Sequence, residues 1–63
     1  MSPADVKAAR KRLGMTQREL GVAIRLSGAE PGHTVRMWES GKRPISGPAT
    51  VAIEALLSGW RPQ

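Results

Sequence analysis

Arg36 and His33 are the side chains whose types and spacing most clearly point to a chemical role. A guanidinium group can donate two parallel hydrogen bonds to O6 and N7 of a guanine, or it can bind a phosphate. A histidine near it could donate to a base or a phosphate, or it could cap a helix. The two residues therefore favour recognition of a nucleic acid, and a solvated surface pair is the alternative.

Enzymatic chemistry finds no support in the sequence. There is one histidine, there is no cysteine, and no pair of carboxylates is positioned for acid–base catalysis. The lack of cysteine excludes a disulfide framework and a thiolate metal site, and no second cluster of ligands accompanies His33. We therefore expect no enzyme activity, no metal, no cofactor and no small-molecule substrate.

The overall charge favours a polyanionic partner. Ten Lys and Arg residues against five Asp and Glu give a net charge of +5 in a chain of 63 residues. Cationic side chains displace the counterions condensed on phosphate backbones, although the same charge could serve solubility alone. We find neither a membrane-spanning apolar run nor an apolar signal core, so we expect a cytoplasmic protein that joins the nucleoid through DNA.

Capping and turn residues divide the chain into four expected helices. Ser2 with Pro3 starts the first, and the capping box of Thr16 and Glu19 starts the second. No strand pattern is present, which predicts an all-α fold in a single domain over residues 1–63. The expected helices span about 3–13, 17–25, 33–40 and 47–57, with a loop at 27–32.

The third expected helix has two distinct faces. Val35 and Trp38, three residues apart, face the core. The outward-facing residues at the start of this helix are Gly32, His33, Arg36 and Met37. Met37 could touch a thymine methyl group or shield the edge of the core. Gly32 could let backbone approach a duplex, or it could serve only as a turn.

Two segments in order carry a resemblance to a known family. They are Thr16-Gln17-Arg18-Glu19-Leu20-Gly21 and Val35-Arg36-Met37-Trp38-Glu39-Ser40-Gly41. With them the chain resembles the Cro and phage-repressor (XRE-like) helix-turn-helix family over about residues 4–58. The resemblance implies a four-helix, lambda-repressor-like DNA-binding domain with the motif in its second and third helices. Two departures are a connection between these helices about four residues longer than usual, and the lack of the fifth helix with which many members dimerise.

The resemblance also implies roles for individual residues. The start of the second motif helix meets base edges in the major groove, which implies base reading by Arg36, His33, Met37 and Gly32. Phosphate contacts are expected from Gln17, Arg18, Lys42 and Arg43, of which Arg18 follows Gln17 on the same exposed turn. Related repressors join the positions of Arg10 and Glu39 in a partly buried ion pair, so we expect one here.

The fourth expected helix is apolar nearly all round. One helix that covers a three-helix core needs only one buried apolar stripe. The apolar residues outside that stripe therefore indicate a surface for a partner. We expect Ile53, Leu57 and Trp60 to form a two-fold contact between two copies. The alternative for Trp60 is a lid folded back on its own core.

These features together predict a sequence-specific regulator of transcription that binds double-stranded DNA. We expect a small repressor, often of its own promoter, such as a phage Cro-like or anti-CRISPR-associated regulator, that binds a palindromic operator as a homodimer. The alternative is an antitoxin or controller subunit that binds a partner protein as well as DNA. RNA binding ranks lower, because both tryptophans are assigned to the core and the interface.

Overall fold

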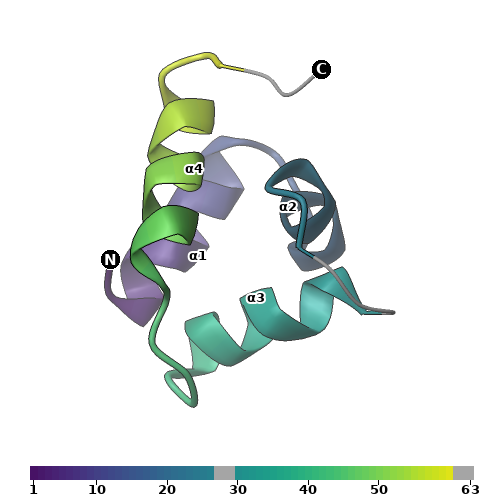
Figure 1. Cartoon of the computed structure of the whole chain (residues 1–63), viewed down its shortest axis with the longest axis vertical. Helices are drawn as coiled ribbons and strands as arrows, with labels where there is room; N and C mark the ends of the chain where they lie inside the picture. The colour runs from purple at the N-terminus through teal and green to yellow at the C-terminus, as the bar shows by residue number, and fades with distance from the viewer. Residues whose placement is uncertain (27–29, 61–63) are drawn as a thin grey trace.

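A computed structural model describes residues 1–26 and 30–60, and these residues form α-helices joined by turns (Figure 1). The helices are α1 (Pro3–Arg12), α2 (Gln17–Ala23), α3 (Pro31–Ser40) and α4 (Gly47–Leu57). The all-α prediction is confirmed for this part of the chain. No helix within it combines the length and the apolar character needed to cross a bilayer.

Short polar side chains start three of the four helices. The Thr16 hydroxyl accepts from Glu19 N at 3.0 Å and the Glu19 carboxylate accepts from Thr16 N at 2.8 Å, so the predicted capping box is present. Ser2 and Asp5 form a second such box, and the hydrogen bonds from Ser2 lower the pKa of Asp5. Ser46 caps α4. Each cap satisfies a backbone N–H that the first helical turn leaves without a partner.

The boundaries of α2 and α3 differ from those expected. α2 ends at Ala23 instead of residue 25, because Arg25 takes a left-handed conformation with φ of 60°. α3 begins at Pro31 instead of residue 33, since proline has the φ angle of a helix and lacks the N–H that the first turn would leave unpaired. Residues 27–29 of the predicted loop lie outside the described part of the chain.

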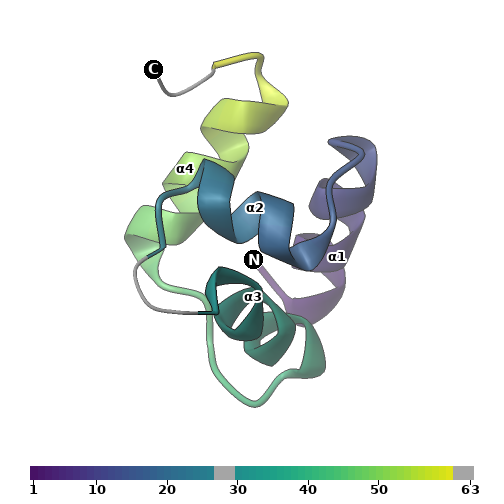
Figure 2. The same ribbon diagram turned by 90° about the vertical axis from the view of Figure 1, so that its right-hand side faces the viewer.

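All four helices contribute to one apolar core. In Figure 2, α2 and α3 face the viewer one above the other, with α4 to the left and α1 to the right. The buried apolar residues are Val6, Ala9, Leu20, Val35, Trp38, Ala49, Ile53 and Leu56. The core positions predicted for Val35 and Trp38 are thus confirmed. Because a chain of this length buries a modest share of its surface, each of these contacts matters to stability.

The outer surface of α4 is not the one predicted. Ile53 is completely buried in the core, so its assignment to a contact between copies is wrong. Leu57 is half-buried and packs against the same core. Trp60 is 53% exposed and Val51 is 65% exposed, so these two residues present apolar surface to solvent. The helix is apolar nearly all round, so its sequence did not show which stripe faces inward.

α2 and α3 approach each other at two glycines. A Cβ at Gly21 would lie 2.5 Å from the carbonyl oxygen of Pro31, and a Cβ at Gly32 would lie 2.9 Å from the backbone nitrogen of Arg18. Both distances are too short for any real side chain, so backbone packs directly on backbone here. Gly21 and Gly32 therefore mark the points of closest approach between α2 and α3.

Substitution of Gly21 by Ala tests this contact. We expect Gly21→Ala to destabilise the protein by about 1–3 kcal/mol, because the added methyl group forces α2 and α3 apart. Gly47→Ala, at the start of α4, adds the same group where nothing lies within 4 Å, and it should leave stability unchanged or slightly raised. Urea unfolding followed by circular dichroism measures both; equal stability of the two variants would contradict the contact.

Candidate nucleic-acid interface

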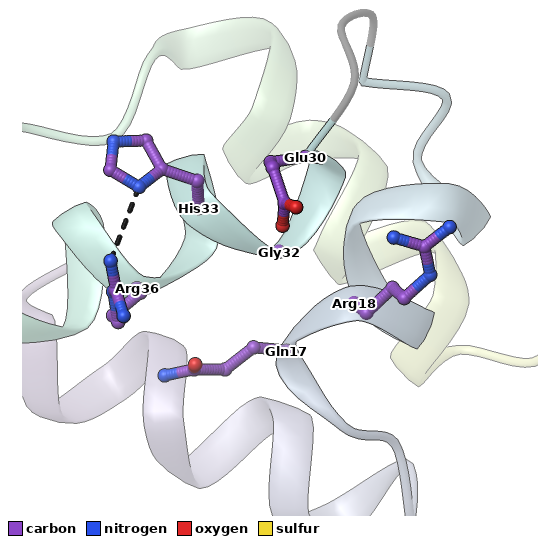
Figure 3. A pocket seen from close by; sticks show the side chains of 6 residues that line it. All are labelled: Gln17, Arg18, Glu30, Gly32, His33 and Arg36. Carbon is purple, nitrogen blue, oxygen red and sulfur yellow. Dashed lines mark hydrogen bonds between the residues drawn. The ribbon is translucent and has the colours of Figure 1, made fainter.

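A hollow of about 380 Å³ opens at the surface where the first turns of α2 and α3 meet (Figure 3). Its lining residues are Gln17, Arg18, Glu30, Gly32, His33 and Arg36. Five of these six residues were predicted to contact DNA, and they come from two segments of the chain. The packing of α2 on α3 therefore gathers predicted base-reading and phosphate-binding residues around one concave surface.

Arg36 and His33 lie on the exposed face of α3, one turn apart. Arg36 Nη2 lies 3.3 Å from His33 Nδ1 (Figure 3). An arginine can only donate, so the bond requires Nδ1 to be unprotonated, with the ring proton on Nε2. A bond of this length orients the guanidinium at the edge of the hollow and leaves its other N–H groups available to a ligand.

Arg10 and Glu39 form the expected ion pair beneath this surface. Arg10 Nε donates to Glu39 Oε2 at 2.6 Å and Arg10 Nη2 donates to Glu39 Oε1 at 3.2 Å. The two side chains are only 15% and 7% exposed. The hydrogen bonds to Glu39 raise the pKa of Arg10 above its ordinary value, so the guanidinium stays charged at any physiological pH.

Two further bonds extend this ion pair into a network across three helices. Arg10 Nη1 donates to the carbonyl oxygen of Met15, in the turn before α2. Gln17 Nε2 donates to Glu39 Oε1 at 3.3 Å. Side chains of α1 and α2 thus both bind the carboxylate of Glu39 on α3. Gln17, predicted to bind phosphate, keeps its amide oxygen and its second N–H for other partners.

Gly32 has a packing role that the sequence did not indicate. Gly32 lies in the hollow, but the space beside its Cα is filled by the backbone of Arg18. The missing side chain therefore admits α2. The predicted contact of Gly32 with a duplex stays a prediction.

The remaining predicted contact residues lie away from the hollow. Lys42 and Arg43 are exposed in the turn after α3, at the opposite end of that helix. Arg43 also borders a separate hollow whose walls include Trp38 and Ile45. Met37 is half-buried on α3, and its contact with a base stays a prediction.

Glu30 is the residue of this surface that the sequence analysis missed. It is the exposed N-cap residue of α3, and its carboxylate lies in the hollow between His33 and Arg18 (Figure 3). The only sequence signal was its position directly before Pro31, and that signal depends on placing the helix start at Pro31. Among the residues that the structure describes, the hollow included, no group of three or more His, Asp or Glu side chains is placed to hold a metal ion.

Comparison of the chain with protein-family models, with curated proteins and with solved structures gives no match.

Replacement of Arg10 tests the ion pair. We expect Arg10→Met to destabilise the protein by about 3 kcal/mol, because Glu39 is left as a nearly buried charge without its partner. Arg12→Met removes an exposed cation from the same helix and should change stability little. The double variant Arg10→Met with Glu39→Met should recover part of the loss. Urea unfolding measures all of them, and similar midpoints for Arg10→Met and Arg12→Met would refute a structural role for the pair.

Proposed function

We propose that this protein is a sequence-specific regulator of transcription that binds double-stranded DNA through α2 and α3, with a lambda-repressor-like arrangement of its four helices. The observation that carries the proposal is the hollow between the first turns of these helices, which is lined by Arg18, Arg36, His33 and Gln17 among others. Two guanidinium groups, an imidazole and an amide offer donors to phosphates and base edges.

α3 suits the role of the reading helix. An α-helix fits the major groove of B-DNA, where each base pair displays its own pattern of donors and acceptors. His33 and Arg36 project from one face of α3, while Val35 and Trp38 anchor the opposite face in the core. The reading face is therefore held at a fixed angle to the rest of the protein, which a readout by hydrogen bonds requires.

Cations at both ends of α3 suit the two walls of the groove. Arg18 lies beside its N-terminal end, and Lys42 and Arg43 follow its C-terminal end. A helix of ten residues is about 15 Å long, and the major groove is about 12 Å wide. Contacts at the two ends of α3 can therefore reach phosphates on both strands and fix the register of the helix between them.

We further propose that two copies associate through the outer face of α4. An apolar groove of about 360 Å³ lies there. It is lined by Pro48, Val51, Ala52, Ala55 and Trp60. α4 contains no Lys or Arg, so two chains that each carry +5 repel each other least across this face. A two-fold contact would present two reading helices to a palindromic site, as expected of a small repressor.

Loss of Arg36 tests the readout. Selection of bound duplexes from a random pool should first yield a preferred sequence. Arg36→Ala should then weaken binding to the preferred duplex by about 1–3 kcal/mol and flatten the preference at one base pair. Lys42→Ala is the matched comparison. It should weaken binding to every duplex alike, and the slope of log K against log salt concentration should become shallower by about one. A wild-type protein without any preferred duplex would overturn the proposal.

Substitution of Val51 tests the association of two copies. We expect Val51→Glu to convert a dimer to monomers in sedimentation velocity, because it buries a carboxylate in the contact. Val22→Glu alters a residue of α2 that is similarly exposed, at 57%, and outside the groove, so this variant should remain dimeric. A folded Val51→Glu variant that still dimerises would place the contact on another face.

A further inference from the structure

Glu30 is a negative charge in the middle of a surface that otherwise suits an anion. It shares the hollow with Arg18 and Arg36 (Figure 3). Its carboxylate nevertheless forms no hydrogen bond or ion pair with any other residue that the structure describes. Although Glu30 is the N-cap residue of α3, its side chain does not cap the helix either. The carboxylate therefore has no structural partner among the described residues, and it faces the space that the proposed function gives to DNA.

A carboxylate in this position weakens binding to any phosphate that comes near it, because like charges repel across a short distance. It becomes favourable only where the ligand offers a hydrogen-bond donor. In the major groove the donors are exocyclic amino groups, N4 of cytosine and N6 of adenine, and glutamate accepts from cytosine N4. Guanine and thymine present acceptor oxygens at the corresponding place, which a carboxylate repels.

We propose that Glu30 is a specificity-determining residue that accepts a hydrogen bond from the exocyclic amino group of a cytosine or adenine in the major groove. This inference rests on the proposed function. It assigns two effects to one carboxylate: Glu30 favours a site that offers an amino group, and it disfavours all other duplexes through repulsion. Arg36, which donates, and Glu30, which accepts, then read opposite kinds of base edge from the same end of α3.

The variant Glu30→Ala separates these effects when its binding is measured at constant salt. On random duplexes it should bind several-fold more tightly than the wild type, because the repulsion is gone. On the selected duplex the gain should be absent or reversed, so the ratio of selected to random affinity should fall about tenfold or more. Scanning every base pair of the selected duplex should show one position where the wild type demands C or A and Glu30→Ala accepts all four pairs.

Glu54→Ala provides the matched control. Glu54 is an exposed glutamate on α4, outside the hollow, and its loss changes the net charge by the same amount. This variant should raise affinity for selected and random duplexes by the same factor and leave the base preference intact. If Glu30→Ala behaves in the same uniform way while the wild type keeps a preferred duplex, Glu30 is only a repulsive charge and the inference is overturned. If the wild type prefers no duplex, the proposed function itself fails.

Discussion

The direct contact of backbone on backbone between α2 and α3 is the constraint on which the candidate site depends. Gly21 lies against Pro31, and Gly32 lies against Arg18, at distances that no side chain could occupy. The two contacts involve the first two residues of α3 and two residues of α2 that are three positions apart, so they fix how closely the helices approach at this end of α3. The hollow exists because the first turns of α2 and α3 are held this close together.

The hydrogen-bond network around Glu39 fixes the position of α1 relative to α2 and α3. Its carboxylate accepts from Arg10 on α1 and from Gln17 on α2, while its own backbone belongs to α3. A core of so few large side chains has limited means to define helix angles, and hydrogen bonds of fixed geometry supply part of that definition. Gln17 belongs to this network and to the lining of the hollow, so the internal scaffold and the outer surface share a residue.

Local signals explain what could be predicted from the sequence. The capping box at Thr16 depends on neighbouring residues alone, and it lies where expected. The positive φ of Arg25 has no such signal, because a residue other than glycine takes that conformation only when tertiary contacts over-determine it. Ile53 was misassigned for a related reason: on a helix that is apolar on every side, periodicity cannot tell the core stripe from the outer one.

In the candidate site, too, some residues could be predicted from local sequence and others depend on tertiary packing. Arg36 and His33 could be predicted because they lie opposite the core residues Val35 and Trp38, a relation that helical spacing fixes. Glu30 could not, since its place in the hollow depends on where α3 begins and on how α2 crosses it. A residue beside a helix start acquires its surroundings from the tertiary packing, and its sequence neighbours carry little information about them.

The absence of Lys and Arg from α4 has a kinetic consequence. Cationic side chains lie on α1, α2 and α3 and in the turns that follow α2 and α3, while α4 has none, so the positive charge is spread unevenly over the molecule. In the field of a polyanion such a body experiences a torque, which turns its cationic side forward before contact is made. Under the proposed function, this torque would raise the fraction of encounters with DNA that lead to binding, and added salt would reduce the effect by screening the field.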